Sequence, residues 1–104
     1  MSISKKNMFA RIWRGIVRAN ASDDYLHYLR ARVIPAYRTA DGNQDALIFY
    51  DAQREFAVFL ILSFWESRAA LEKFSDPQLD TNLSRQERGL LLAFESTATV
   101  YEIL

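Results

Sequence analysis

Residues 56–74, FAVFLILSFWESRAALEKF, decide the fold that this sequence predicts. The segment opens with an apolar run from Phe56 to Trp65 that contains one serine, and a charged stretch follows it at once. A strand in a small open sheet normally alternates between a buried face and a solvated face. This strand is apolar on both faces, which predicts a sheet with helices on one side and a second apolar contact on the other.

The two faces of this strand indicate how the chain assembles. One face carries Phe56, Val58, Leu60, Leu62 and Phe64, and the other carries Ala57, Phe59, Ile61 and Trp65. Helices can cover only one of them, and the other would expose an apolar patch of a few hundred Å², which monomers avoid. We therefore predict a homodimer in which the free sheet faces of two copies meet across a two-fold axis.

The N-terminal half of the chain predicts a strand followed by a helix. Residues 8–18 are apolar at both parities and form the first strand candidate. Ser22 is the expected N-cap of a helix that Pro35 ends or kinks. The expected buried stripe of this helix consists of Tyr25, Leu29, Val33, Ala36 and Tyr37.

The rest of the chain completes an alternating pattern. The expected elements are a strand at 46–50, the strand at 56–65, a helix at 67–74 with Ser67 as its expected cap, a loop at 76–83, a helical piece at 84–92 and a strand at 95–104. The resulting order, β-α-β-β-α-β, is that of the α+β ferredoxin-like sandwich, with helices on one face of an antiparallel sheet. We expect residues 1–104 to form a single domain with a flexible segment at 1–7.

Composition narrows the classes of function. The 104 residues include 13 basic and 13 acidic side chains, so bulk charge favours neither nucleic acid nor an anionic membrane. Cysteine is absent, no signal peptide is recognisable, and no apolar run approaches the roughly 20 residues that span a bilayer. We expect a cytoplasmic protein. An RNA-recognition domain shares the element order, but REFAVF at 54–59 lacks the glycine and stacking aromatic of its third-strand motif.

Several stretches together resemble one known family. FARIWRGIV at 9–17, PAYRTADGN at 35–43, SFWES at 63–67 followed by RAALEKF, and LLAFESTATVYEIL at 91–104 look like the antibiotic biosynthesis monooxygenase family. The resemblance covers residues 8–104. It implies a ferredoxin-like protomer whose sheet pairs with that of a second copy in a dimeric α/β barrel.

The resemblance also carries expectations about chemistry. Some members of the family oxygenate aromatic polyketides with dioxygen and no bound cofactor, and a branch degrades haem through an Asn, a Trp and a His. Of that haem-degrading set only Trp65 is matched, because the Asn position falls near Ile12 and no histidine follows His27. The anthrone-oxidising branch matches at Trp65 and loosely at Arg85, but its Asn is Ile61 here. We expect no cofactor and no metal site.

The candidate site residues follow from these patterns and from the resemblance. The catalytic candidates are Trp65, Arg85 and Arg11, and the candidates for substrate binding are Trp65, Trp13, Tyr25 and Phe64. The competing interpretation is that the aromatic residues only fill the core and that Arg11 is a paired or solvated edge residue. His27 lies outside the apolar stripe of its helix, so we expect it in solvent.

Two functions remain open at this stage. The first is a cofactor-independent monooxygenase that acts on a small aromatic or polycyclic substrate, quinol-like or anthrone-like, in an apolar pocket. The second is a non-catalytic dimeric module of the same fold that binds a small ligand or has a stress-related role. The isoleucine at position 61 and the lack of a recognisable acid–base pair favour the second.

Overall fold

The computed structural model describes residues 8–74 and 85–104, so the segments predicted at 1–7 and 76–83 lie outside the described residues. The described elements are β1 (Phe9–Arg18), η1 (Ala19–Ala21), α1 (Ser22–Tyr28), η2 (Leu29–Val33), α2 (Ile34–Arg38), β2 (Asn43–Ala52), β3 (Phe56–Trp65), α3 (Arg68–Phe74), α5 (Arg85–Leu90), β4 (Leu91–Phe94) and β5 (Thr99–Glu102). The chain has the predicted α+β ferredoxin-like architecture.

The sheet is antiparallel, with strand order β2-β3-β1-β4, and β5 also pairs with β1. β3 pairs with β1 along its full length, from Phe9 opposite Trp65 to Arg18 opposite Phe56. A tight turn joins β2 to β3, where the amide of Gln53 donates to the carbonyl of Phe56. The hairpin and the bounds predicted for the central strand are therefore confirmed.

The C-terminal part differs from its prediction. The strand predicted at 95–104 is confirmed at its centre but is shorter: β5 (Thr99–Glu102) pairs with the first half of β1, and a further strand, β4 (Leu91–Phe94), pairs with the second half. The helix predicted at 84–92 ends at Leu90, directly after Gly89, a residue that weakens helices. Leu91 instead starts β4 opposite Val17, at a register shift in β1. This pairing along β1 replaces the last predicted turn of helix.

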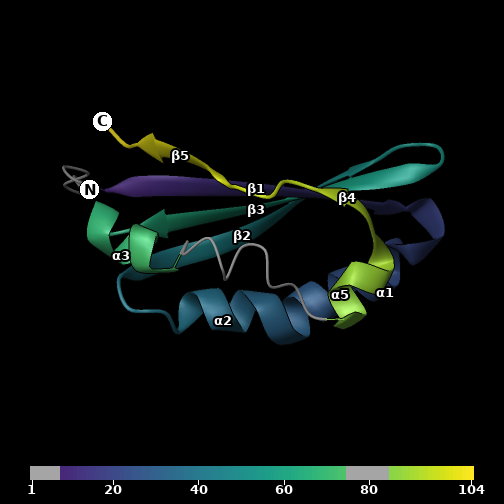
Figure 1. Cartoon of the computed structure of the whole chain (residues 1–104), viewed down its shortest axis with the longest axis horizontal. Helices are drawn as coiled ribbons and strands as arrows, with labels where there is room; N and C mark the ends of the chain where they lie inside the picture. The colour runs from purple at the N-terminus through teal and green to yellow at the C-terminus, as the bar shows by residue number, and fades with distance from the viewer. Residues whose placement is uncertain (1–7, 75–84) are drawn as a thin grey trace, which may run out of the picture.

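The helices lie on one side of the sheet, as Figure 1 shows with α1, α2 and α5 below the strands. Toward them point Trp13 and Val17 of β1 and Phe59, Ile61 and Trp65 of β3, all of them buried. They pack against the buried side chains of the helices, which are Tyr25, Tyr28, Leu29, Ile34, Tyr37 and Leu71. The assignment of faces on the third strand is confirmed.

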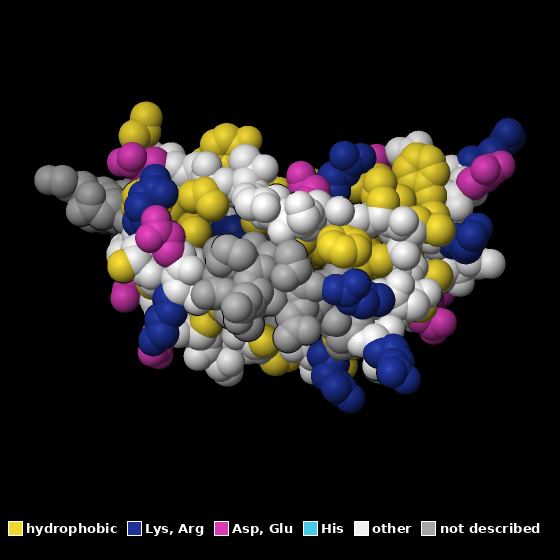
Figure 2. Space-filling view, viewed as in Figure 1, with side chains coloured by type: hydrophobic (Ala, Val, Ile, Leu, Met, Phe, Trp, Pro, Cys, Tyr) yellow, Lys and Arg dark blue, Asp and Glu magenta, His cyan; other side chains and the backbone are white. Residues whose placement is uncertain are grey.

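The opposite side of the sheet is apolar and bears no described helix. We call it the free face; it comprises Ala10, Ile12, Ile16, Leu47, Phe49, Val58, Leu60, Leu62 and Phe64, with Arg14 among them. Phe49 is 47% exposed and Leu47 is 38% exposed. Figure 2 shows apolar side chains along the upper margin, where Figure 1 places this side of the sheet. Within the described residues no helix is long and apolar enough to cross a membrane.

The first helix passes Pro35 without ending, so the prediction that this proline ends or kinks the helix needs correction. Residues 29–33 form a π-helical turn in which the amide of Ile34 donates to the carbonyl of Leu29. Pro35 follows in the first turn of α2, where its missing N–H is tolerated. A π turn contains one extra residue, so the buried stripe shifts by one position. Ile34 is buried in place of Val33, and Ala36 is exposed.

The two predicted helix caps differ in outcome. Ser22 is not the N-cap; it is the first residue of α1, and its hydroxyl donates to the carbonyl of Ala19 in the preceding 3₁₀ turn. Ser67 caps α3 as predicted, because its Oγ accepts the amide of Ala70 at 3.1 Å. The cap fixes the start of α3 directly after β3, which places Phe74 over the end of the sheet next to Trp65.

Candidate functional site

Arg11 is a buried cation between the sheet and the helices. Its side chain extends from β1 on the helix-facing side, and only 1% of the residue is exposed. One guanidinium nitrogen donates to the hydroxyl of Tyr37 at 2.6 Å. The guanidinium also lies 5.7 Å from the ring centre of Tyr37 and 5.6 Å from that of Phe74, within cation–π range. A buried charge requires such partners, because desolvation without compensation is costly.

Trp65 lies next to Arg11 at the end of β3 and is fully buried. Its indole N–H donates to the hydroxyl of Ser63 at 2.9 Å, and that hydroxyl lies 3.4 Å from the backbone carbonyl of Arg11. The indole packs on Phe74 with ring centres 4.8 Å apart. We call Arg11, Tyr37, Ser63, Trp65 and Phe74 the arginine cluster.

A surface hollow of about 220 Å³ adjoins the arginine cluster. It is lined by Ala40, Asp41, Ala70, Lys73 and Phe74. Phe74 belongs to both, since its ring also packs on Tyr37 with centres 4.5 Å apart. A single aromatic ring therefore separates the hollow from the buried guanidinium.

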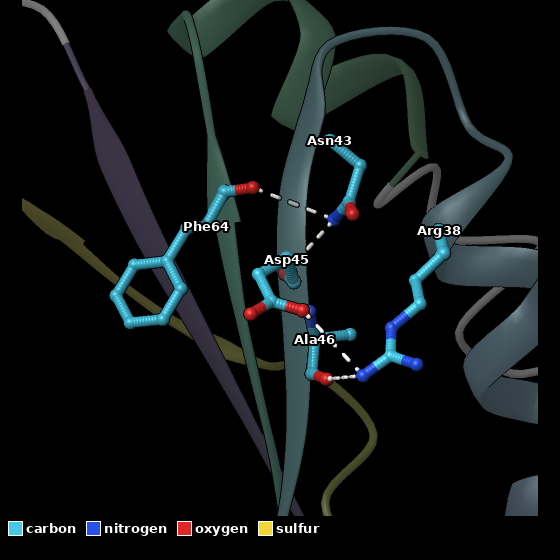
Figure 3. A network of polar contacts seen from close by, with 5 residues as sticks. All are labelled: Arg38, Asn43, Asp45, Ala46 and Phe64. Atoms are coloured by element: carbon cyan, nitrogen blue, oxygen red, sulfur yellow. Dashed lines mark hydrogen bonds and ion pairs between the residues drawn. The ribbon is translucent and has the colours of Figure 1, made fainter.

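The helix that carries Tyr37 is held in place by contacts to the start of β2 (Figure 3). Arg38 donates to the carbonyl of Ala46 at 3.0 Å and lies 3.5 Å from the carboxylate of Asp45. The amide of Asn43 donates to the carbonyls of Asp45 and Phe64 across a register shift. The Arg38 contacts fix the end of α2 against the sheet, one residue after Tyr37, and the Asn43 contacts hold the start of β2 on β3.

The π turn sets the direction of Tyr37. Twelve residues of regular α-helix, at 3.6 per turn, would rotate Tyr37 by about 120° from Tyr25. The extra residue of the π turn removes about 100° of that rotation. Both tyrosines therefore face the sheet, and both are buried.

A second polar pair lies at the other end of the layer. Tyr25 is fully buried, and its hydroxyl donates to Glu87 Oε2 at 2.9 Å. Burial raises the pKa of the Glu87 carboxyl, and the hydrogen bond from Tyr25 opposes that rise. Burial and the adjacent Glu87 raise the pKa of Tyr25. The ring of Tyr25 meets Phe59 edge-on at 5.1 Å. We call Tyr25, Phe59 and Glu87 the glutamate cluster.

Trp13 lies along β1 between the two clusters and is 4% exposed. Its indole N–H donates to the carbonyl of Glu95 at 2.9 Å, and its ring stacks on Phe94 at 6.4 Å. The ring covers Gly15, where an added Cβ would lie 2.7 Å from it. The glycine therefore leaves the space that the indole occupies.

The structure brings four of the six candidate residues to one side of the sheet. Trp65, Trp13, Tyr25 and Arg11 all face the helices, whereas Phe64 lies on the free face and Arg85 is exposed on α5. The description of Arg11 as an edge residue is wrong, because it is buried on a central strand. His27 is exposed as expected.

Sequence reasoning did not identify Glu87. RQERGL at 85–90 is typical of a charged surface helix, and nothing in that stretch marks one carboxylate as buried. The sequence predicts Phe74 at the end of a helix but does not indicate its part in the arginine cluster. Among the described residues, no group of three or more His, Cys, Asp or Glu side chains is arranged to hold a metal ion.

Comparison with solved structures confirms the resemblance at the level of the fold. A protein of Nitrosomonas europaea named as an antibiotic biosynthesis monooxygenase aligns with a TM-score of 0.68 at 11% identity, covering 100% of this chain and 96% of that one. Rv0793 from Mycobacterium tuberculosis aligns with a TM-score of 0.64 at 25% identity, covering 93% and 95%.

A third similar structure is that of a haem-degrading protein. The haem degrader MhuD of Mycobacterium tuberculosis, solved with two haems in its active site, aligns with a TM-score of 0.66 at 16% identity, covering 92% of this chain and 95% of that one. No family model and no curated protein matches the sequence. The likeness to these proteins thus lies in the arrangement of strands and helices.

Proposed function

We propose that this chain binds a small aromatic molecule between its sheet and its helices and oxygenates it with dioxygen. The observation that carries the proposal is the arginine cluster, in which a buried guanidinium lies against the rings of Tyr37 and Phe74, and Phe74 in turn packs on Trp65. Aromatic faces bind planar rings, and the cation favours a substrate that becomes an anion. The likeness to structures named as antibiotic biosynthesis monooxygenases supports the same reaction.

The reaction draws its electrons from the substrate. An anthrone-like CH₂ group and dioxygen give a ketone and water, with one oxygen atom entering the carbon and the other leaving as water. Loss of a proton from the CH₂ group comes first and leaves an anion whose charge spreads through the ring to the carbonyl oxygen. Arg11 stabilises that oxygen, and Trp65 and Trp13 hold the rings. The hollow beside Phe74 is the entry route.

The active species in this proposal is a homodimer. The free face exposes Phe49 and Leu47 beside the half-buried Leu60 and Leu62, and a second free face is self-complementary across a two-fold axis. The absence of cysteine suits a reducing compartment, so we place the dimer in the cytoplasm.

Oxygen uptake tests the catalytic proposal. The purified protein is incubated with anthrone and a panel of quinols, and dissolved oxygen is followed with an electrode. We expect uptake above the buffer rate with at least one substrate and a kcat/KM about tenfold lower in Trp65→Phe. Glu55→Gln, at an exposed residue of the β2–β3 turn, is the control and should retain the wild-type rate. Uptake at the buffer rate across the panel would contradict catalysis.

One observation favours a non-catalytic binding module as the second candidate. Ile61, at the position where the resemblance expects an amide side chain, is buried and apolar, so it offers no hydrogen bond to a substrate oxygen. Such a module binds its ligand without turnover. Native mass spectrometry of the purified protein checks this alternative, which requires a bound small molecule and no oxygen uptake.

A further inference from the structure

Two buried charges of opposite sign face the same interior. Among the described residues, the buried polar and charged side chains are Arg11, Ser22, Ser63 and Glu87. Only two of these are ionisable, one a cation from β1 and the other a carboxyl from α5. Glu87 is 6% exposed. A carboxyl in the core of a small domain costs stability unless it is well partnered, so its presence calls for an explanation.

Tyrosine hydroxyls link the two charges. Arg11 donates to the hydroxyl of Tyr37, and Glu87 accepts from the hydroxyl of Tyr25. The two tyrosines face the sheet from one continuous helix, and Tyr37 is among the groups that raise the pKa of Tyr25. Trp13 lies between the two clusters along β1 and belongs to the same buried core, with its ring over Gly15.

The proposed function requires a proton acceptor that the arginine cluster does not provide. His27 is exposed on the outer side of α1, away from the aromatic layer. The phenol of Tyr25 is a poor base, because its hydrogen is committed to Glu87. Glu87 is a carboxyl on the interior side, and Tyr25 fixes one of its two oxygens at 2.9 Å.

We infer that Glu87 is the general base of the proposed oxygenation and that Tyr25 positions its carboxylate. This inference rests on the proposed function. The carbon–hydrogen bond of the substrate breaks, its proton passes to a carboxylate oxygen of Glu87, and its electron pair stays on the substrate. The negative charge then spreads to the carbonyl oxygen of the substrate, near Arg11. Dioxygen then reacts with the anion. The substrate is thus an aromatic carbon acid that spans the two clusters.

The electrostatics of the layer suit this role. Burial raises the pKa of the carboxyl, which brings it closer to the working pH and makes it a stronger base than a solvated glutamate. Tyr25 from α1 faces Glu87 directly, the titratable groups that act on Tyr25 itself are Tyr28 from α1 and Tyr37 from α2, and Arg88 is the neighbouring charge on α5. Arg11 lies toward the opposite end of β1 from the glutamate cluster.

Hydrogen–deuterium exchange separates this inference from the proposed function. Anthrone is incubated with the protein in D₂O without oxygen, and loss of the CH₂ signal is followed by NMR; oxygen uptake is measured separately. The variants are Glu87→Gln, whose amide oxygen still accepts from Tyr25, and Glu55→Gln, an exposed control on the β2–β3 turn. We expect Glu87→Gln to lower both rates by at least about 100-fold and Glu55→Gln to change neither.

The outcomes are distinct. Wild-type exchange that Glu87→Gln abolishes, without oxygen uptake, supports Glu87 as a base and contradicts the oxygenation. Oxygen uptake that Glu87→Gln leaves unchanged overturns the role of Glu87 and leaves the oxygenation standing. An absence of exchange with the wild-type protein overturns the base as well.

Tyr25→Phe provides a second variant with a readout that a purely structural role would not move. The hydrogen bond from Tyr25 lowers the pKa of Glu87, so its removal raises that pKa further. A base acts in its deprotonated form, and the ascending limb of the pH–rate profile should therefore move to higher pH. A limb that stays in place while the rate falls uniformly would contradict the positioning role.

Discussion

At the scale of single residues, the interior depends on one missing side chain. Gly15 is the point on β1 over which the indole of Trp13 lies, with ring atoms 2.7 and 2.9 Å from the position of an added Cβ. Leu91 from β4 approaches the same position at 3.0 Å. The glycine is thus required for close approach of a ring to the backbone, and this approach brings Trp13 between the two clusters.

Gly15→Ala should therefore destabilise the protein. The added methyl group meets a buried ring that has no free space in which to move, and overpacking of this kind costs about 1–3 kcal/mol. Gly89→Ala is the matched control: Gly89 is in α5 with nothing within 4 Å of an added Cβ, so the change should stabilise by about 0.5–1 kcal/mol. Urea unfolding of both variants measures the difference. Equal free energies of unfolding would contradict the packing argument.

Residues differ in how far their roles can be predicted from sequence. Parity sorts the side chains of β3 into two faces correctly, because side chains alternate along a strand, and the register of β1 with β3 then places Trp13 on the face of Trp65. Glu87 had no such indicator: its partner Tyr25 is 62 positions away, and only the docking of α5 on α1 buries it. Long-range pairing of polar groups depends on tertiary structure, which local patterns do not contain.

At the scale of elements, the π turn decides which residues of the first helix meet the sheet. A regular period predicts Val33, Ala36 and Tyr37 in the buried stripe, and the structure buries Tyr37 as predicted but Ile34 in place of Val33, with Ala36 exposed. The indicator was Pro35, whose ring disfavours a regular helix around the preceding turn. The sequence does not reveal whether a helix ends at a proline, kinks there or forms a π turn before it, since tertiary packing selects among these.

Changing the length of the π turn by one residue in either direction should have unequal effects. Deleting Ala31 together with Pro35→Ala produces a regular helix in which both tyrosines keep facing the sheet, so stability should change little. Inserting an alanine after Ala31 rotates Tyr37 by about 100° away from Arg11 and should cost about 2–5 kcal/mol in lost core packing. Thermal and urea unfolding compare the two. An insertion that is as stable as the deletion would show that the phase of this helix is unimportant.

At the scale of the whole molecule, the sheet separates a reactive side from an assembly side. The helix-facing side contains both polar clusters, and the free face is apolar apart from a few charged side chains such as Arg14. The alternation that the sequence shows on β3 predicts this division correctly. The partner of the free face is outside what one chain can show, so the dimer remains a prediction.

Phe49→Glu tests the dimer. Phe49 is 47% exposed on the free face, so a charge there leaves the interior of the protomer undisturbed but would be buried in the dimer. We expect light scattering to give twice the 12.1 kDa chain mass for the wild-type protein and the chain mass for Phe49→Glu. Leu104→Glu, at a fully exposed C-terminal residue, should remain dimeric. A wild-type protein that is monomeric at micromolar concentration would refute the proposal.

The position of β2 bears on whether this chain self-associates at high concentration. In the sheet of described strands β2 is an edge, and half of its peptide groups point away from β3. At the start of β2, the register shift and the hydrogen bond from Arg38 to the carbonyl of Ala46 make the edge irregular. At the other end of β2, Asp51 adds a negative charge. The apolar centre at 47–50 is shorter than the roughly six residues of a cross-β segment. Both ends of this strand therefore disfavour edge-to-edge pairing with another chain.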